Sequence, residues 1–344
     1  RQPVYEPTPT YPFCHSATVV ELPSGGLLAA WHAGVREPQR HTAIWLSRLE
    51  GQRWAEPTRV AHQPDECLWN PVLYRDSTDS VWLFYKVGQD VWFWTGVYIK
   101  STDEGETWSV PTALPAGLVG PTKNKPITLS NGHILCGSSS ETWHSWAAWV
   151  EDSADGGRTW VRRGPIVVPG QGEPVGTPNP TWDGVSHDVI LPRDFLGLIQ
   201  PTIWEYAPGK LKMLLRPTRA VGVICSATSD DYGCTWSPVT KTNIPNPNSG
   251  IDAVRLADGR IVLACNPTWN PKQSERTPLS LFMSTDNGDT WPWRLDLETD
   301  LGEFSYPSII QAADGALHVV YTWDQGGVRY VRHATLDPDD IAGG

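Results

Sequence analysis

Ser101-Thr-Asp-Glu-Gly-Glu-Thr-Trp108 is a complete copy of an eight-residue pattern, Ser-x-Asp-x-Gly-x-Thr-Trp, that decides the fold. The pattern recurs at residues 153–160, 229–236 and 284–291, and a degraded copy occupies residues 47–54. An Asp side chain can bond to the nearby backbone and Gly tolerates positive φ, so each copy predicts a tight turn. The tryptophan is expected to start the next strand and to pack beside the turn. Four copies of one frame predict a repeat architecture.

Six short apolar segments form a second repeated feature, and each opens on a polar or aromatic residue. The opening residues are His15, Asn70, Lys125, Gln200, Asp252 and Tyr306. Successive openings are 52 to 55 residues apart, except for one step of 75 residues that ends at Gln200. Short strands with turn signals at regular spacing are typical of four-stranded antiparallel blades. Six registers therefore predict an all-β, six-bladed β-propeller that occupies residues 1–344 as a single domain.

The sixth register ends without a copy of the turn pattern, after a third strand expected near 328–332. We expect the N-terminal segment around Gln2 to Glu6 to supply the missing outer strand, because this closure removes an open sheet edge. The long step holds about 20 extra residues between Trp160 and Gln200. A loop of that size is interpreted as a wall of the site, and the alternative is a plain surface excursion.

The composition limits the classes of partner. The net charge is −11, which argues against nucleic acid and anionic membrane surfaces. No apolar run approaches the ~20 residues that a membrane helix needs. The six cysteines show no C-x-x-C spacing and no EF-hand pattern occurs, so neither a metal nor a cofactor is expected. Cysteine usage favours a reducing compartment, the cytoplasm over a secreted location.

The inner strands of a propeller converge on its axis, so the six opening residues are expected to line one funnel. Further candidates reach the same end from second strands and adjoining loops: Trp31, Trp323, Arg36, Arg216, Arg276 and Lys123. An acidic protein that directs Lys and Arg side chains to one funnel is expected to bind an anion there. A guanidinium gives a carboxylate two parallel hydrogen bonds, and aromatic faces suit a sugar ring. The alternative is a hydrated channel of mutually bonded polar residues, with a structural role for Asn70.

The repeated turn resembles the Asp-box of the sialidase superfamily, and the resemblance extends over nearly the whole chain. The segments 123–126, 246–252 and 305–307 resemble sequence motifs of a divergent, sialidase-like subgroup. The resemblance implies a substrate carboxylate held by three arginines, a nucleophilic Tyr activated by a Glu, and an Asp as acid/base.

Three positions match that site and three differ. Arg216, Arg276 and Tyr306 match the second and third arginines and the tyrosine. The differing positions carry His15 in place of the first arginine, Gln200 in place of the glutamate, and His41 in place of the aspartate. Gln200 cannot accept a proton from Tyr306, whereas histidine retains proton chemistry near neutral pH.

The sequence therefore leaves three functions open. The first is an exo-acting glycoside hydrolase on an acidic saccharide, a sialic, ulosonic or uronic acid glycoside. Its catalytic candidates are Tyr306, His41, Asp252 and His15, and its substrate-binding candidates are Arg216, Arg276, Lys125, Lys123, Gln200, Asn70, Arg36, Trp31 and Trp323. The second is a lyase that cleaves a uronate by β-elimination, with an Arg or Lys on the carboxylate and a Tyr or His as base. The third is a non-catalytic carbohydrate-binding propeller.

Overall fold

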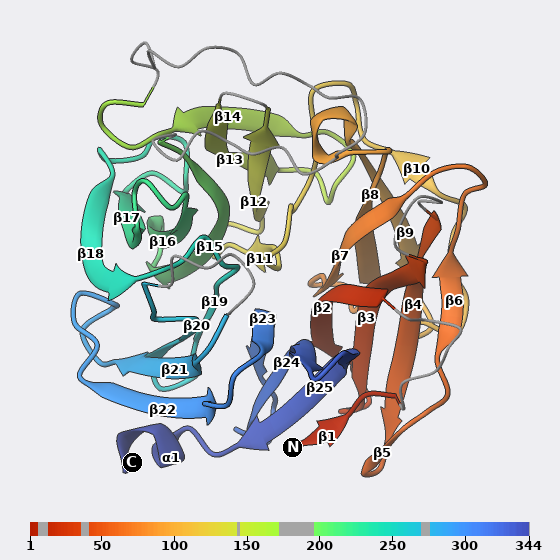
Figure 1. The fold of residues 1–344 in the computed structure, drawn as a ribbon. Helices are drawn as coiled ribbons and strands as arrows, with labels where there is room; N and C mark the ends of the chain where they lie inside the picture. The colour runs from red at the N-terminus through yellow and green to blue at the C-terminus, as the bar shows by residue number, and fades with distance from the viewer. Residues whose placement is uncertain (6–12, 36–40, 143–144, 172–195, 270–275, 344) are drawn as a thin grey trace, which may run out of the picture.

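The computed structural model describes residues 1–5, 13–35, 41–142, 145–171, 196–269 and 276–343. Six antiparallel sheets stand as blades around a common axis, and Figure 1 shows the ring. Five sheets have four strands and the sheet of blade 1 has five. The all-β, six-bladed propeller predicted from the repeats is confirmed.

The first three blades follow one another along the chain. Blade 1 comprises β2 (Phe13–Glu21), β3 (Leu27–Val35), β4 (His41–Glu50), β5 (Arg53–Trp54) and β6 (Thr58–Ala61). Blade 2 comprises β7 (Leu68–Arg75), β8 (Val81–Val87), the short 3-10 helix η1 (Val91–Phe93), β9 (Thr95–Ser101) and β10 (Thr112–Ala113). Blade 3 comprises β11 (Ile127–Thr128), β12 (Ile134–Glu141), β13 (Trp146–Ser153) and β14 (Val161–Ile166).

The remaining blades complete the ring. Blade 4 comprises β15 (Leu198–Ala207), β16 (Lys210–Pro217), β17 (Val223–Ser229) and β18 (Thr240–Pro245). Blade 5 comprises β19 (Asp252–Arg255), β20 (Ile261–Cys265), β21 (Leu279–Ser284) and β22 (Trp293–Glu298). Blade 6 comprises β23 (Glu303–Gln311), β24 (Leu317–Gln325), β25 (Val328–Leu336) and the N-terminal β1 (Gln2–Pro3), and α1 (Asp339–Ala342) follows it. None of the helices in the described residues has the length and apolar character needed to span a bilayer.

The N-terminal strand closes the ring as predicted. β1 pairs antiparallel with β25, with Gln2 opposite His333 and Pro3 opposite Arg332. The Val4 N–H extends the pairing by donating to the Val331 carbonyl at 2.8 Å. Blade 6 thus takes its outer strand from the opposite end of the chain, and its sheet edge is covered.

Each complete copy of the eight-residue pattern forms the same hydrogen-bonded turn. In the first copy, Asp103 Oδ1 accepts from the Thr107 N–H at 2.9 Å, and Ser101 Oγ accepts from the Gly105 N–H at 2.7 Å. The Trp108 indole N–H donates to the Gly105 carbonyl at 3.1 Å. The Asp and Ser contacts recur in the other three copies. The turns are therefore as predicted, but in these four copies the tryptophan precedes the next strand instead of starting it.

The two ends of the propeller carry different kinds of connection. Leu68, at the start of β7, pairs with Val87 at the end of β8, and Val87 pairs with Thr95 at the start of β9. The inner strands therefore open at the same end as the connections between second and third strands. Ser101 pairs with Val81 at the other end, so the Asp-box turns lie on the face opposite the strand openings. The apolar core lies between neighbouring blades.

We expect the Asp-box aspartates to stabilise the ring. Asp231 accepts from the Thr235 N–H at 2.8 Å, the Thr235 hydroxyl at 2.6 Å and the Ser229 hydroxyl at 2.8 Å. Asp231→Ala should lower the free energy of unfolding by about 1–2 kcal/mol, because it leaves turn donors without an acceptor. Denaturant titration measures this, and the exposed neighbour Asp230 gives the control Asp230→Ala. Equal decreases in the free energy of unfolding for Asp231→Ala and Asp230→Ala would contradict a stabilising role of the Asp-box turn.

A buried histidine pair lies at the seam where blades 6 and 1 meet. His318 Nδ1 lies 2.9 Å from His333 Nε2, and the two rings stack with centroids 5.2 Å apart. The Trp54 indole N–H of blade 1 donates to His333 Nδ1 at 3.3 Å. Burial lowers the pKa of His333 to about 3 and also lowers the pKa of His318. Both imidazoles are therefore neutral near neutral pH.

This pair should make the fold sensitive to acid. A folded-state pKa below the unfolded value means that the unfolded chain binds a proton first as the pH falls below about 6.5. The contribution of the neutral histidines to the free energy of unfolding is therefore fully present above pH 6.5. It declines towards pH 3, by up to about 1.4 kcal/mol per pH unit for His333. Denaturant titrations at several pH values in this range give the free energy of unfolding, and its decrease with falling pH should be shallower for His333→Gln than for the wild type. The exposed-site variant His62→Gln should keep the wild-type slope, and an unchanged slope in His333→Gln would refute the assignment.

Candidate functional site

Irregularities at the openings of the inner strands set the directions of the site residues. The register shifts at the start of β2, β7, β15 and β23, and each shift holds a residue at positive φ: Ser16 (56°), Asn70 (38°), Gln200 (51°) and Tyr306 (53°). A bulge of this kind changes the direction of a side chain at a sheet edge. The blade 1 counterpart of Tyr306 is therefore Ser16, and His15 lies one residue earlier than the sequence spacing placed it.

Arg216 and Tyr306 form the centre of the site. Arg216, near the end of β16, donates from Nη1 to the Tyr306 hydroxyl and to Gln200 Oε1, both at 2.8 Å. The guanidinium carbon also lies 5.3 Å from the centre of the Tyr306 ring. Arg216 is buried, whereas Tyr306 is partly exposed. The sequence prediction that these three residues meet is thus supported by the geometry, and Gln200 contacts the arginine through its amide oxygen.

Arg276 approaches the same tyrosine from blade 5. Its backbone bridges to Glu303 of β23, which fixes the start of its side chain beside blade 6. Its guanidinium carbon lies 5.5 Å from the centre of the Tyr306 ring. The carbonyl oxygen of Asn248 lies 2.9 Å from Arg216 Nη2 and 3.5 Å from Arg276 Nη2. Two guanidiniums from different blades therefore converge on one oxygen atom.

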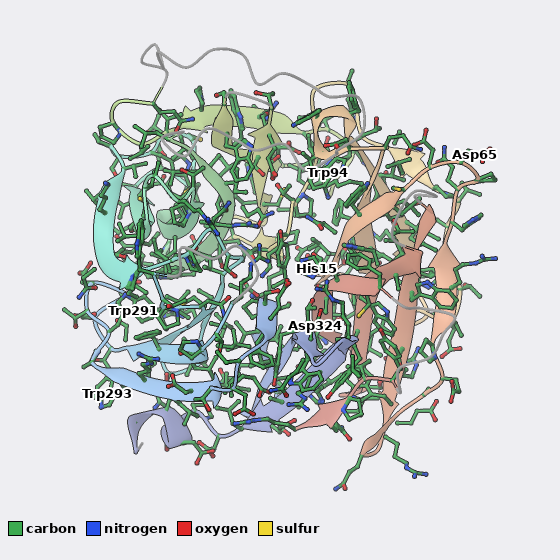
Figure 2. All side chains as sticks on the ribbon, in the orientation of Figure 1. His15, Asp65, Trp94, Trp291, Trp293 and Asp324 are labelled. Carbon is green, nitrogen blue, oxygen red and sulfur yellow. The ribbon has the colours of Figure 1, made fainter. Side chains whose placement is uncertain are left out.

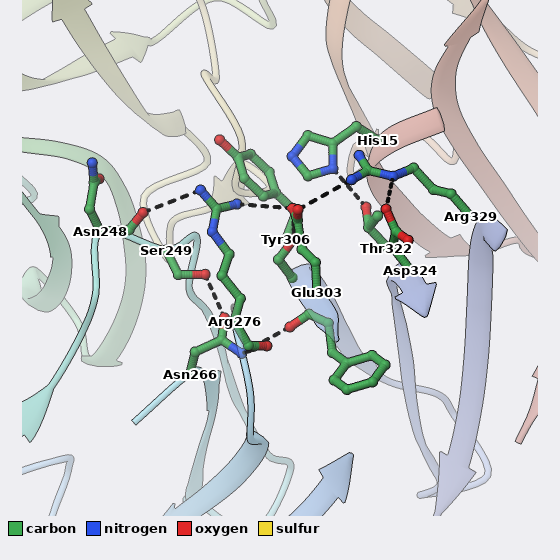
Figure 3. Close-up of polar contacts among 12 residues, drawn as sticks. His15, Asn248, Ser249, Asn266, Arg276, Glu303, Tyr306, Thr322, Asp324 and Arg329 are labelled. Carbon is green, nitrogen blue, oxygen red and sulfur yellow. Dashed lines mark hydrogen bonds and ion pairs between the residues drawn. The ribbon is translucent and has the colours of Figure 1, made fainter. Parts of the chain in front are cut away.

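A chain of ion pairs continues from Arg276 into blade 6, as Figure 3 shows. Glu303 Oε1 lies 3.4 Å from Arg276 Nη1, and Glu303 Oε2 lies 3.2 Å from Arg329 Nη2. Arg329 Nε lies 2.7 Å from Asp324 Oδ2. Sequence reasoning missed Glu303, Arg329, Asp324 and Asn248. Glu303 stands three residues before Tyr306 and could have been found from that spacing, whereas Arg329 gave no local signal.

His15 contacts Tyr306 across the junction of blades 1 and 6. The two ring centroids are 4.2 Å apart, and His15 Nδ1 lies 3.0 Å from the Thr322 hydroxyl oxygen. Figure 2 shows His15 and Asp324 near the middle of the ring. Desolvation, followed by the charge of Arg329, holds the pKa of His15 well below its usual value. The imidazole is therefore neutral at neutral pH and adds no positive charge to the site.

Lys123 is engaged with backbone and amide oxygens. Its ammonium group donates to Asn124 Oδ1 and to the Ile251 carbonyl, both at 2.9 Å, and to the Pro307 carbonyl. Lys123 is 3% exposed, and desolvation lowers its pKa to about 7. With three acceptors around the ammonium, the contacts join the segment that leads into blade 3 to blades 5 and 6.

Lys125 and Asp252 form a second internal link. Lys125 Nζ lies 2.8 Å from Asp252 Oδ2, which also accepts from the Ile309 N–H at 2.9 Å. Asp252 Oδ1 accepts from the Thr202 hydroxyl at 3.0 Å and from the Ala253 N–H at 2.9 Å. Asp252 is fully buried and each of its oxygens already accepts two hydrogen bonds. This geometry favours a role in holding blades 3 to 6 together.

Three substrate-binding candidates have side chains that are engaged in other contacts. Trp31 is 1% exposed and stacks on Tyr5 with centroids 5.0 Å apart, so its prediction as a substrate contact is wrong. Trp323 packs against Phe304 and Tyr330, at centroid distances of 6.0 and 4.7 Å. Side chains alternate along a strand, so the neighbours His32 and Thr322 face the site in their place. Asn70 is buried and donates from Nδ2 to the Thr122 carbonyl at 3.1 Å, which joins two blades.

Three other predictions fall outside the described residues. They concern Arg36, the side chain of His41 and most of the long connection before Gln200, which spans residues 172–195. His41 itself is the first residue of β4. Within the part of the chain that is described, no group of three or more His, Cys, Asp or Glu side chains could hold a metal ion.

The fold and the repeated turns define a class of protein, the propellers built from BNR (Asp-box) repeats. The chain belongs to the BNR repeat-like domain family, whose pattern matches residues 25–319. No curated protein sequence matches the chain.

Solved structures show the same fold at low sequence identity. A Hadza microbial sialidase, Hz136, is 18% identical with a TM-score of 0.73, over 95% of this chain and 66% of its own. This chain therefore spans just under two thirds of that sialidase. A Dyadobacter fermentans protein of unknown function is 17% identical with a TM-score of 0.75, over 98% of both chains. The intramolecular trans-sialidase of Ruminococcus gnavus, solved with oseltamivir carboxylate, is 14% identical with a TM-score of 0.71, over 99% of this chain and 98% of its own. The chain thus has the sialidase-like propeller fold.

The carboxylate of Glu303 should compete with a bound anion. It neutralises part of the charge of Arg276 and Arg329, so Glu303→Gln should tighten the binding of acetate or sulfate about tenfold. Calorimetric titration measures the affinity. Glu298→Gln is the matched control. Glu298 Oε1 lies 2.8 Å from Arg332 Nη1, and this ion pair is not part of the site. Equal affinities in the wild type and Glu303→Gln would contradict an anion site at these arginines.

Proposed function

We propose that this protein is an exo-acting glycoside hydrolase on an acidic saccharide, a glycoside of a sialic, other ulosonic or uronic acid. Arg216 and Arg276 bind the sugar carboxylate. The observation that carries the proposal is the convergence of both guanidiniums on the Asn248 carbonyl oxygen and on the ring of Tyr306. An oxygen held by two guanidiniums stands for a carboxylate oxygen of the substrate, since planar forks of N–H donors match a carboxylate.

The similar structures agree with this choice of ligand. The Ruminococcus gnavus trans-sialidase was solved with oseltamivir carboxylate, and Hz136 is called a sialidase. A low dielectric strengthens the attraction, because Arg216 is buried and a charge there is weakly screened by water. Acidic residues outnumber basic residues in the chain, so the anion affinity arises from the local grouping of arginines and not from net charge.

Tyr306 and His15 supply the proposed proton chemistry. The Thr322 hydroxyl engages His15 Nδ1, which leaves Nε2 as the nitrogen that can accept a proton. Neutral His15 takes the phenolic proton as Tyr306 attacks the anomeric carbon, and the positive charge of Arg216 stabilises the developing phenolate. Gln200 then orients Arg216, and Asp252 positions the blades. His41 is proposed as the acid/base: it protonates the leaving oxygen as the glycosidic bond breaks. It then takes a proton from the water that cleaves the bond between the sugar and Tyr306, and His15 returns the phenolic proton.

A second function is favoured by one feature of the same geometry. The Tyr306 hydroxyl contacts Arg216 instead of a carboxylate, and a neutral imidazole lies beside its ring. In a β-elimination, the arginines neutralise the uronate carboxylate and His15 removes the proton α to it. Tyr306 gives its proton to the departing glycosidic oxygen, and the product carries a carbon–carbon double bond conjugated with the carboxylate.

One assay separates the two reactions. Aryl glycosides of sialic acid, its deaminated analogue and glucuronic acid report hydrolysis by release of the aryl alcohol, and uronate oligosaccharides report elimination by ultraviolet absorbance. Tyr306→Phe and His15→Ala should each lower kcat by about 10²–10⁴-fold, the usual range for acid–base groups. Tyr330→Phe is the matched control. The Tyr330 hydroxyl accepts a 2.7 Å hydrogen bond from Arg332, and this contact is not part of the site.

The rate of either proposed reaction should stay high in moderate acid, because both use His15 as the base. Since the pKa of His15 is held well below 6.5, His15 stays an unprotonated base until the pH falls well below that value. Rates that fall with protonation near pH 6.5 would exclude His15 as the base. Binding of acidic sugars without turnover on any substrate of the panel would instead favour a carbohydrate-binding propeller.

A further inference from the structure

Asn248 covers one edge of the Arg216 guanidinium with two of its own oxygen atoms. The side-chain oxygen Oδ1 lies 3.1 Å from Arg216 Nε, and the backbone carbonyl oxygen lies 2.9 Å from Arg216 Nη2. The same carbonyl oxygen lies 3.5 Å from Arg276 Nη2 (Figure 3). Parallel N–H donors on one edge of a guanidinium are the arrangement that binds a carboxylate through both of its oxygens. The two oxygens of Asn248 therefore take the place of the two oxygens of a carboxylate.

This contact leaves Arg216 with almost no unused donors. Nη1 donates to Gln200 Oε1 and to the Tyr306 hydroxyl, both at 2.8 Å. Together with the contacts of Asn248, these bonds engage every N–H of Arg216 except one on Nη2, as far as the described residues show. A substrate carboxylate can therefore gain two hydrogen bonds from Arg216 only by replacing an oxygen already bound there. Asn248 is the acceptor that can give way, because it is partly exposed whereas Gln200 is buried.

The segment around Asn248 holds an alternative partner for the displaced carbonyl group. The Ser249 N–H donates to Asn246 Oδ1 at 2.8 Å, so the Asn246 amide lies against the peptide that joins residues 248 and 249. Asn246 is fully buried, and its Nδ2 has no hydrogen-bond partner among the described residues. A buried donor without an acceptor destabilises a fold. A turn of the 248–249 peptide brings the Asn248 carbonyl group to this donor and releases the arginines.

We propose that Asn248 is an autoinhibitory residue, an internal substitute for the substrate carboxylate that the acidic sugar must displace from Arg216. The inference rests on the proposed function and concerns the regulation of the same site. Until the sugar binds, Asn248 holds Arg216 and Arg276 together. On binding, the carboxylate takes Nε and Nη2 of Arg216, and the Asn248 carbonyl group accepts from Asn246 Nδ2. The affinity for an acidic sugar is lowered by the fraction of molecules in which Asn248 occupies the arginines.

Two substitutions at residue 248 test the proposal in opposite directions. Acetate is titrated into the full chain, and calorimetry gives the affinity. Asn248 has a φ of 64°, which glycine adopts freely and aspartate tolerates. Asn248→Gly removes Oδ1 and frees the peptide to turn, so it should bind acetate about tenfold more tightly than the wild type. Asn248→Asp places a carboxylate on Arg216, so it should bind acetate about tenfold more weakly.

Asn287→Gly is the matched control. Asn287 also has a positive φ, 60°, and its Oδ1 accepts from the Trp204 indole N–H at 2.7 Å in the turn of residues 284–291. Its acetate affinity should equal that of the wild type. A crystal structure of the wild type with acetate gives a second readout. We expect acetate on Nε and Nη2 of Arg216, with the Asn248 carbonyl group turned towards Asn246.

The outcomes separate this inference from the proposed function. Acetate binding by Asn248→Gly that equals the wild type, is weaker, or is absent in both would overturn the inference. An acetate complex in which both oxygens of Asn248 stay on Arg216 would overturn it as well. Because acetate is not a glycoside, a failure of the hydrolase proposal appears only in assays with acidic glycosides. Tighter binding in Asn248→Gly and weaker binding in Asn248→Asp, without turnover of any glycoside, would support the inference and contradict the hydrolase.

Discussion

The site depends on the closure of the ring by β1 on β25. Tyr306 and Arg329 belong to blade 6, and His15 belongs to blade 1, so these residues meet only if the two blades pack against each other. The pairing of Gln2 with His333 and the contact of Trp54 with His333 lie at that seam. Closure therefore both removes the open edge of blade 6 and assembles the central group of side chains.

Buried and partly buried lysines near the axis link the blades. Lys123 and Lys125 are bound by carbonyl oxygens and by Asp252, and these contacts hold neighbouring blades together. Lys86 of blade 2 is also buried, with its ammonium 2.6 Å from the Pro121 carbonyl, and desolvation lowers its pKa to about 8. The arginines face the partly exposed Tyr306. Arg216 is itself buried and donates to Gln200, Tyr306 and Asn248, whereas the Arg276 side chain is partly exposed.

Much of the site followed from the sequence, and the errors have a common cause. The meeting of Arg216, Arg276 and Tyr306 was predicted because Tyr306 opens a strand, Arg216 lies near the end of another, and Arg276 lies on a loop in a matching register. Trp31 was misplaced because a position near the right end of a strand does not say which face of the sheet the side chain takes. A single-residue bulge moved the blade 1 register from His15 to Ser16, and no local signal distinguishes the two.

The sequence by itself determined the number of blades, the turns and the closing strand. The turns depend on hydrogen bonds within eight residues, and the number of blades depends on the spacing of apolar strands, so both can be read along the chain. The closing strand followed from the count of strands, because the sixth register lacks an outer strand of its own. Only the tertiary structure decided that Glu303 bridges two arginines and that each carboxylate oxygen of Asp252 accepts two hydrogen bonds. It also decided that ring contacts run from Tyr306 through His15 and His32 to Trp69. Such contacts join residues far apart in sequence, and they depend on side-chain directions that are fixed when neighbouring blades pack.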